Sequence, residues 1–390
     1  MLALHGRLLE SRGIEAEAPR ALYKISTNPA LPKPLTRDMA YLCRSADPPE
    51  GYGLYLALEH QRDFLGALDR GASVAVLPAS ADFIEHGDIM RIVPAERAYR
   101  VLFRSRAHHN SILLTERCNH YCLMCSQPPR DVQDDWLIEE TRRLIPMLPT
   151  SMRELGFTGG EPTLYGDRLL EILGMTKRYL PRTAVHILSN GRRFSDLSFA
   201  QAYAAVRHHD VMVGIPLYSD DASRHNYVVQ AEKAFDETIL GILNLKRLKQ
   251  RVEIRVVLHA QTIDRLPELA RFIARNLLFV DQVALMGLEI TGFTRGNLGV
   301  LWVDPYDYRD TLEEAVDILS AYGVPVCVYN HALCVVTDRV RPFCVRSISD
   351  WKNEYLPACD GCALRAECGG FFSSAVKYRH SDHIRPVRAA

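Results

Sequence analysis

Three cysteines in the first third of the chain constrain its structure more than any other feature. Cys118, Cys122 and Cys125 have the spacing C-x3-C-x2-C. A [4Fe–4S] cluster ordinarily takes four thiolates, so a cluster held by these three keeps one iron without a protein ligand. That iron is open to a substrate or a cofactor. The spacing favours a cluster-binding loop, and the alternative is a zinc knuckle that recruits a fourth ligand such as His120.

A glycine-rich turn follows the cysteines, in the string Gly-Phe-Thr-Gly-Gly-Glu-Pro-Thr of residues 156–163. It ends a short apolar run and precedes a helical pattern from Asp167 to Tyr179, which predicts the order strand, turn, helix. Glycines let the backbone approach a ligand closely. The carboxylate of Glu161 is suited to holding an ammonium group. A lone Gly-Gly-Glu is a weak signal, but after the three cysteines it indicates a cofactor site.

With these two motifs the chain resembles the radical S-adenosylmethionine (SAM) superfamily, over roughly residues 110 to 300. The resemblance implies that Cys118, Cys122 and Cys125 hold a [4Fe–4S] cluster and act in catalysis, and that SAM chelates its open iron. It also implies that the turn contacts the methionyl amine of SAM. The residues of this turn are Gly159, Gly160, Glu161 and Pro162.

Four later strings match the ends of the family's third to sixth strands, namely His186–Gly191, Val213–Ser219, Val256–Gln261 and Gly287–Phe293. The resemblance implies that residues in or near them contact the ribose and adenine of SAM: Ser189, Asn190, Leu258 and Ile290. One position departs from the family, because the residue before the third cysteine is usually aromatic and here is Met124. Methionine can still pack against adenine through its polarizable sulfur.

Within the superfamily the chain is most similar to the radical SAM maturases of His-Xaa-Ser systems, of the HxsC type. The segments that carry this resemblance are Thr115–Pro129, Ser347–Tyr355 and Cys359–Phe372. It implies a ribosomally made peptide substrate with His-Xaa-Ser repeats and a second radical SAM maturase as a partner. A one-electron donor such as flavodoxin or ferredoxin would reduce the cluster.

The pattern of apolar runs predicts an α/β fold with a partial (β/α)6 barrel. Short runs rich in β-branched residues at 111–115, 183–188, 211–216, 253–259 and 281–288 alternate with helical patterns such as Ala231 to Lys249. This alternation implies parallel strands joined by right-handed crossovers, with the active site at the carboxyl ends of the strands. We expect three parts: a small mixed α/β module (1–105), the barrel (106–322) and a cysteine-rich extension (323–390).

The extension holds a second group of cysteines. Cys359, Cys362 and Cys368 have the spacing C-x2-C-x5-C, which fits structural zinc or a second iron–sulfur cluster. Beside a radical SAM barrel it resembles the auxiliary [4Fe–4S] extensions of peptide-modifying members. The fourth ligand is open between Cys334 and Cys344. Cys327 lies in an apolar run and is expected in a core strand, and the basic tail from Lys377 to Ala390 is expected to be solvated and mobile.

Composition excludes several classes of protein. The 47 basic and 47 acidic residues balance, so no basic excess indicates nucleic-acid binding. No apolar run reaches the ~18 residues of a membrane span, and the first residues lack the order of a signal peptide. Ten cysteines among 390 residues are far fewer than the roughly 8–10% of a disulfide scaffold. Clustered cysteines without a signal peptide point to metal in the cytoplasm.

Two other functions fit parts of the pattern. A molybdopterin-type radical SAM enzyme, acting on a small molecule or a nucleotide, also combines a barrel with a second cluster. A non-catalytic scaffold that binds zinc or an iron–sulfur cluster would need no SAM, and the Gly-Gly-Glu turn argues against it.

Overall fold

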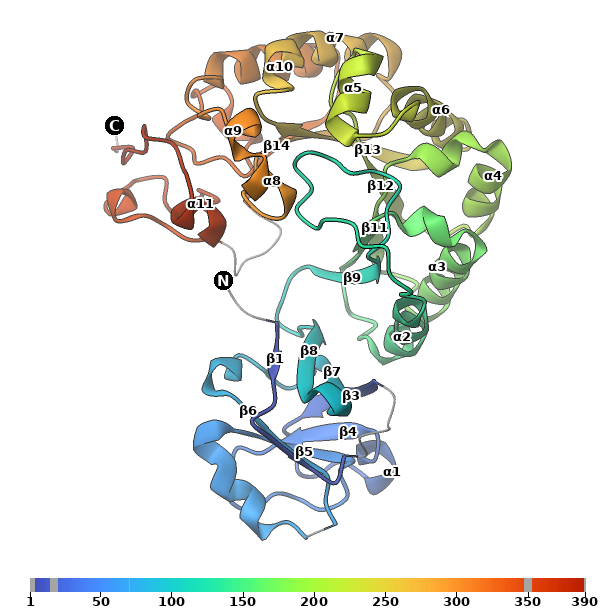
Figure 1. Cartoon of the computed structure of the whole chain (residues 1–390), viewed down its shortest axis with the longest axis vertical. Helices are drawn as coiled ribbons and strands as arrows, with labels where there is room; N and C mark the ends of the chain where they lie inside the picture. Colours follow the sequence, from blue (N-terminus) through green and yellow to red (C-terminus); the bar gives the residue numbers. More distant parts are fainter. Residues whose placement is uncertain (1–3, 15–19, 70, 347–352, 389–390) are drawn as a thin grey trace. The chain divides into compact units, whose positions relative to one another are not determined.

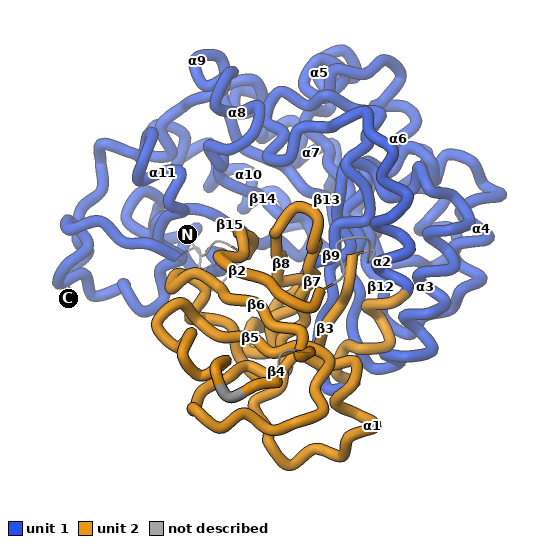
Figure 2. Tube along the Cα trace, turned by 60° about the horizontal axis from the view of Figure 1, so that its bottom comes forward, with its two compact units in different colours: residues 1, 111–142, 150–390 blue, residues 2–110, 143–149 orange. Residues whose placement is uncertain are grey.

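The computed structural model describes residues 4–14, 20–69, 71–346 and 353–388. Most of the string Ser347–Tyr355 therefore lies outside the described residues. The chain forms two compact units, one of residues 111–142 and 150–390 and the other of residues 2–110 and 143–149 (Figure 2). Among the described residues no helix is both long and apolar enough to span a membrane.

The smaller unit is built on an eight-stranded mixed sheet in the order β1-β8-β7-β3-β4-β5-β6-β2. Its strands are β1 (His5–Arg7), β2 (Glu10–Arg12), β3 (Ala21–Ser26), β4 (Met39–Leu42), β5 (Leu54–Leu58), β6 (Val74–Leu77), β7 (Ile89–Val93) and β8 (Ala98–Phe103). Its described helices are short: α1 (Lys33–Thr36) and the 3-10 helices Glu59–Ala67, Ala79–Ala81, Pro94–Glu96 and Ile145–Met147. The longest of these is the 3-10 helix Glu59–Ala67, so the unit is mostly strand.

The first two strands close this sheet on itself. β1 and β2 are at its opposite edges, yet two residues separate them in the chain. The amide of Leu8 donates to the carbonyl of Arg97 (2.7 Å), and that of Leu9 donates to Val76 (2.9 Å). The side chain of Leu8 packs into a core with Ile25, and the closed sheet encloses that core.

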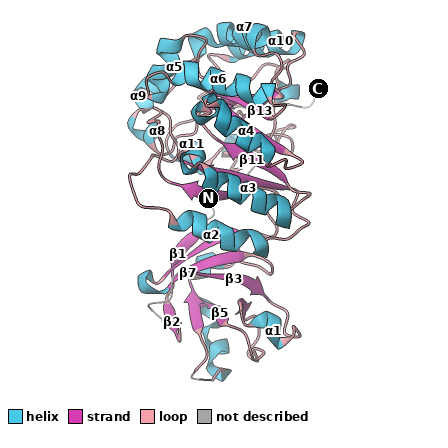
Figure 3. Ribbon diagram, turned by 90° about the vertical axis from the view of Figure 1, so that its right-hand side faces the viewer, coloured by secondary structure: helices cyan, strands magenta, loops and turns pink. Residues whose placement is uncertain are grey.

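The larger unit is a curved sheet of seven strands in the order β15-β14-β13-β12-β11-β10-β9, and the pairs from β10 to β15 are parallel. Helices cover its outer side (Figures 1 and 3). The strands are β9 (Asn110–Thr115), β10 (Glu154–Gly159), β11 (Ala184–Leu188), β12 (Val211–Pro216), β13 (Arg251–Leu258), β14 (Gln282–Gly287) and β15 (Val326–Tyr329). The prediction of an α/β partial barrel is therefore confirmed.

The helices of this unit follow the apolar periodicity of the sequence. In α7 the residues Leu266, Leu269, Ala270, Ile273 and Ala274 are buried, which is one face of a helix. The α-helices are α2 (Trp136–Leu144), α3 (Asp167–Tyr179), α4 (Leu197–Ala205), α5 (Ala222–Val229), α6 (Ala234–Arg247), α7 (Leu266–Asn276), α8 (Phe293–Gly296), α9 (Leu298–Leu301), α10 (Arg309–Ala321) and α11 (Ser373–Lys377). The 3-10 helices are Pro162–Tyr165, Arg192–Ser195, Ile263–Arg265, Arg341–Phe343 and Pro357–Cys359.

Two features of the C-terminal region differ from expectation. The run with Cys327 forms a strand as expected, β15, but this strand pairs with β14 and adds a seventh strand to the six expected in the barrel. The tail was expected to be solvated, but His383 stacks on Tyr306 with ring centroids 4.0 Å apart. The amide of Asp382 also donates to Asp304 Oδ2 (3.2 Å), so this tail packs on the barrel. The ring stacking and this hydrogen bond hold the tail against the protein, although its basic composition predicts a solvated segment.

Candidate active site

The first cysteine group lies on the loop after β9. Burial, the Glu161 carboxylate and Cys125 together raise the pKa of the Cys118 thiol to about 12. Burial, Cys125 and Cys118 also raise the pKa of Cys122. The three thiols therefore affect one another's ionisation, and burial disfavours the thiolate form unless a positive charge is nearby. Iron supplies such a charge, because metal ligation and proton release are coupled.

The Gly-Gly-Glu turn packs directly against this loop. The amide of Gly160 donates to the Thr115 carbonyl (2.8 Å), and that of Glu161 donates to the Arg117 carbonyl (2.8 Å). A Cβ atom on Gly160 would lie 2.0 Å from the Arg117 oxygen and 3.0 Å from Cys118 Cβ. Glycine is therefore required here so that the turn and the cysteine loop can touch.

The Glu161 side chain connects the turn to the end of β11. Its Oε1 accepts hydrogen bonds from the amide and hydroxyl of Thr163 (2.9 and 2.5 Å) and from the Ser189 hydroxyl (2.8 Å). Its Oε2 accepts from the Asn190 amide (2.6 Å). The carboxylate is buried, which raises its pKa, while these hydrogen bonds oppose the shift. Glu161, Ser189 and Asn190, all predicted from motifs, thus meet in one network.

Asp134 holds the other end of the cysteine loop, and sequence reasoning missed it. This buried carboxylate accepts from the Thr115 hydroxyl (2.8 Å), the Glu116 amide (2.5 Å), Arg117 Nε (3.1 Å) and the Tyr165 hydroxyl (2.8 Å). Burial disfavours its charge, but the hydrogen bonds outweigh burial and lower the pKa of Asp134. No motif marks this residue, since its partners come from two separate segments, residues 115–117 and Tyr165.

Contacts from distant segments fix the middle of the loop. Asn190 Nδ2 donates to Asn119 Oδ1 (2.6 Å), which ties the loop to the end of β11. From α8 the Thr294 hydroxyl donates to the Met124 carbonyl (3.1 Å), and the Phe293 amide donates to that of Cys125 (2.9 Å). These bonds restrict the loop on both sides.

Gly292 allows the approach of α8 to the loop. It has a φ of 53°, and a Cβ atom there would lie 2.2 Å from the Cys125 carbonyl oxygen. Both the positive φ and the close contact favour glycine.

The remaining predicted SAM residues lie at the carboxyl ends of strands. Met124 is buried in an apolar cluster with Tyr218 and Val228. Pro162 is buried at the start of a 3-10 helix that follows the turn. Leu258 is the last residue of β13, Ile290 lies shortly after β14, and both are 1% exposed. Their positions match the expected side of the barrel, while their side chains are packed into the protein.

The second cysteine group gathers around Cys368. Cys334 interacts electrostatically with Cys368 and Cys359, whereas Cys344 interacts with Cys368 and Arg341. Burial is the main cause that raises the pKa of both thiols. The amides of Leu333 and Gly370 point at Cys368 Sγ (3.5 and 3.4 Å). The fold thus brings together cysteines that are distant in the sequence: Cys334, Cys344, Cys359 and Cys368.

The side chains around both cysteine groups can be compared with the arrangement of a single-ion site. In the described part of the chain no three His, Cys, Asp or Glu side chains are placed to hold one metal ion. Both ring nitrogens of the buried His120 lack a hydrogen-bond partner among these residues, and burial lowers its pKa to about 3. A neutral imidazole is the form that ligates a metal, so the zinc alternative with His120 stays open. The sequence motif of three thiolates on one loop suits the ligands of a [4Fe–4S] cluster.

Comparison with known proteins identifies the domain. Residues 112–273 match the radical SAM superfamily, and this range contains the cysteine loop and the Gly-Gly-Glu turn. The match covers less than half of the chain and supports a radical SAM superfamily domain within it. Radical SAM enzymes use a [4Fe–4S] cluster and SAM. A search of curated proteins finds no match.

The comparison with solved structures finds proteins that were solved with bound SAM. One is anSMEcpe with bound AdoMet, which is 14% identical with a TM-score of 0.50 and covers 71% of this chain and 92% of that chain. Another is SuiB of Streptococcus suis bound to SAM, which is 18% identical with a TM-score of 0.46 and covers 58% of this chain. The present chain spans about half (51%) of SuiB. The likeness to anSMEcpe shows a shared fold, and the His-Xaa-Ser subgroup stays a prediction.

Proposed function

We propose that this radical SAM protein reductively cleaves SAM and modifies a ribosomally made peptide with His-Xaa-Ser repeats. The observation that carries the proposal is the contact between the cysteine loop and the Gly-Gly-Glu turn. Cys118, Cys122 and Cys125 would hold the [4Fe–4S] cluster. When bound and reduced, that cluster supplies the electron that converts SAM to a 5′-deoxyadenosyl radical.

The chain's own residues would orient SAM and exclude water. The network of Glu161, Ser189 and Asn190 fixes the turn that lies beside Cys118. Met124, Leu258 and Ile290 would form the apolar surroundings of the adenine, with Gly159 and Pro162 shaping the turn. The cofactors would carry out the radical reaction, while the protein would orient SAM and the substrate and keep water out of the site.

The second cysteine group would hold an auxiliary [4Fe–4S] cluster. Cys359, Cys362 and Cys368 supply three ligands, and Cys334 or Cys344 supplies the fourth. With four protein ligands this cluster would have no open iron. Its role would be electron transfer or the shaping of the peptide site.

A peptide substrate has two independent supports. The motif Cys359–Phe372 and the first cysteine loop resemble those of His-Xaa-Ser maturases. In addition, anSMEcpe, which shares the fold with a TM-score of 0.50, has been solved with bound AdoMet and the Kp18Cys peptide. A one-electron donor such as flavodoxin or ferredoxin, and a second radical SAM maturase, would act with this chain.

Anaerobic reconstitution followed by iron and sulfide analysis tests the proposal. Two [4Fe–4S] clusters require about eight irons per chain. The triple substitution of Cys118, Cys122 and Cys125 by Ala should leave about four, because the second group remains. Cys43→Ala is the control, since Cys43 is buried in the other unit and should leave both clusters intact. Full iron in the triple variant would contradict the assignment.

SAM cleavage and peptide modification provide the second readout. With dithionite the wild type should produce 5′-deoxyadenosine, and the triple variant should not. A His-Xaa-Ser peptide should change mass, while a peptide of scrambled sequence should not. If SAM cleavage instead modifies a small molecule or a nucleotide, the result would favour the molybdopterin-type alternative. Absence of 5′-deoxyadenosine would favour the non-catalytic scaffold.

A further inference from the structure

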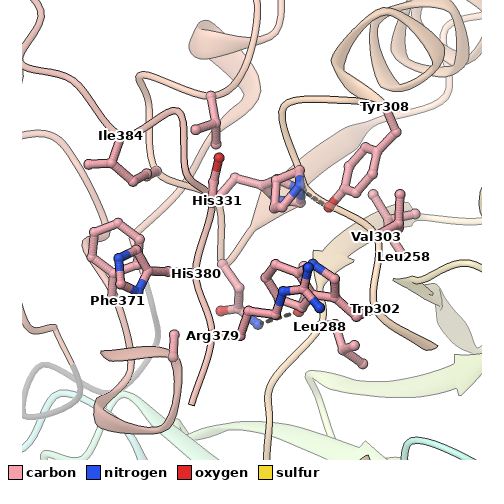
Figure 4. Close-up of a pocket in the computed structure, with 17 residues that line it drawn as sticks. Leu258, Leu288, Trp302, Val303, Tyr308, His331, Phe371, Arg379, His380 and Ile384 are labelled. Atoms are coloured by element: carbon pink, nitrogen blue, oxygen red, sulfur yellow. Dashed lines mark hydrogen bonds between the residues drawn. The ribbon is translucent and has the colours of Figure 1, made fainter. Parts of the chain in front are cut away.

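A cavity of about 60 Å³ lies at the carboxyl ends of β13, β14 and β15 (Figure 4). Its wall combines Leu258 and Leu288 from the strand ends, Trp302 and Tyr308 from the segment before α10, and Phe371 and Arg379 from the C-terminal region. A single water needs roughly 10–15 Å³ of such volume, so the cavity has room for a larger group. Since Leu258 is a proposed SAM neighbour, the cavity adjoins the proposed reaction site.

The deep wall of the cavity is polar but uncharged. His331 Nδ1 lies 2.8 Å from the Tyr329 carbonyl, so this nitrogen carries the proton. Its Nε2 then accepts from the Tyr308 hydroxyl (2.8 Å), a bond visible in Figure 4. Burial lowers the pKa of His331 to about 4, so the ring is neutral at pH 7. The interior therefore offers no positive charge of its own.

Positive charge enters the cavity from Arg379. Its guanidinium lies over the Trp302 ring, 4.9 Å from the centroid (Figure 4). It makes no hydrogen bond or ion pair with any described residue, and no Asp or Glu lines the cavity. The buried Nδ1 of His380 also lacks a partner in the described chain. An anionic group in the cavity would meet an uncompensated cation.

Two more cations lie over the ring of Tyr378, the residue before Arg379. Arg295 and Lys377 lie 5.2 and 5.5 Å from the centroid of this ring. Neither side chain pairs with a carboxylate within the described residues. The tail that carries Arg379 is anchored further on by the stacking of His383 on Tyr306. The cation thus projects from a segment that is held in place.

We propose that this cavity receives a carboxylate of the peptide substrate, which Arg379 binds; the inference rests on the proposed function. A planar guanidinium binds a carboxylate through two parallel hydrogen bonds, and the indole beneath it limits its rotation. The carboxylate belongs either to an acidic side chain or to the peptide's C-terminus. Bound there, it places the neighbouring residues of the peptide beside the proposed SAM site.

Binding of three synthetic peptides to the reconstituted full chain tests this. The first is acetyl-His-Glu-Ser-His-Glu-Ser-amide, the second has Gln for Glu, and the third is the Gln peptide with a free C-terminal carboxylate. Dissociation constants are measured by calorimetry in the presence of SAM. The Glu peptide or the free-carboxylate peptide should bind about ten- to hundredfold more tightly than the amidated Gln peptide, and which one does so identifies the source of the carboxylate.

Arg379→Gln should abolish that preference, whereas Arg388→Gln should keep it, because Arg388 is a tail cation that does not line the cavity. Arg379→Glu should instead prefer a peptide with Lys in place of Glu. Equal binding of all three peptides by the wild type would overturn the inference. An equal loss of SAM affinity in Arg379→Gln would also overturn it, since the cavity would then belong to SAM. Production of 5′-deoxyadenosine, measured in parallel, tests the proposed function separately.

Discussion

The backbone amide of Asn190 donates a 2.6 Å hydrogen bond to Oε2 of Glu161, which joins the end of β11 to the turn after β10. The Glu161 carboxylate therefore has a structural task inside the protein. Its oxygens accept four hydrogen bonds from Thr163, Ser189 and Asn190. Loss of this carboxylate would alter the proposed SAM site through the position of the turn.

Glu161→Gln should destabilise the protein as well as weaken SAM binding. The side-chain amide of the new Gln would place an N–H group opposite groups of Thr163, Ser189 or Asn190 that are themselves donors. Each buried donor left without an acceptor lowers the stability of the fold by about 1–3 kcal/mol. Urea denaturation of the metal-free protein measures the loss of unfolding free energy, and calorimetry measures SAM affinity. Glu171→Gln, on the exposed side of α3, is the control. Weaker SAM binding with unchanged stability would mean that the carboxylate contacts SAM directly.

Gly160→Ala should prevent assembly of the first cluster. The new methyl group would lie 2.0 Å from the Arg117 oxygen, so the cysteine loop must move. We expect iron content to fall from about eight to about four per chain, as measured after anaerobic reconstitution. Gly174→Ala is the matched control, because it lies in α3 with no atom within 4 Å of the new methyl group. That variant should keep its iron and gain up to about 1 kcal/mol. Full iron in Gly160→Ala would refute the packing argument.

His331 should make stability depend on pH. Its pKa is lowered from 6.5 to about 4 by burial, so the unfolded chain binds the proton more readily than the folded one. The stabilisation is complete above pH 6.5 and is lost as pH falls toward 4, by about 3 kcal/mol. Urea denaturation between pH 7 and 4 should show a shallower loss in His331→Gln than in the wild type. The exposed His209→Gln should follow the wild type, and equal slopes in all three would contradict this assignment.

The neighbours of the second cysteine group favour Cys334 as the fourth ligand. Cys334 interacts with both Cys368 and Cys359, whereas Cys344 has Cys368 as its one cysteine neighbour among the interactions that shift its pKa. Cys334→Ser should therefore change the EPR signal of the second cluster, and Cys344→Ser should not. Spectra are recorded in the Cys118, Cys122 and Cys125 triple variant, so that one cluster contributes. The reverse result would assign the ligand to Cys344.

The sequence by itself determined the α/β partial barrel and the radical SAM domain. Apolar periodicity is a local property, so the strands and α6 could be placed within a few residues. The motifs are also local, since Cys118, Cys122 and Cys125 lie on one loop. Their grouping follows from chain connectivity.

Tertiary structure decided what depends on contacts between distant segments. Thr294 donates to the carbonyl of Met124 across 170 positions, and Asp134 binds partners from two segments, residues 115–117 and Tyr165. Packing also placed Arg379 over Trp302, in a tail that composition alone predicted to be solvated. Hydrogen bonds and ring contacts of this kind depend on distances set by the whole fold, which neither spacing nor periodicity encodes.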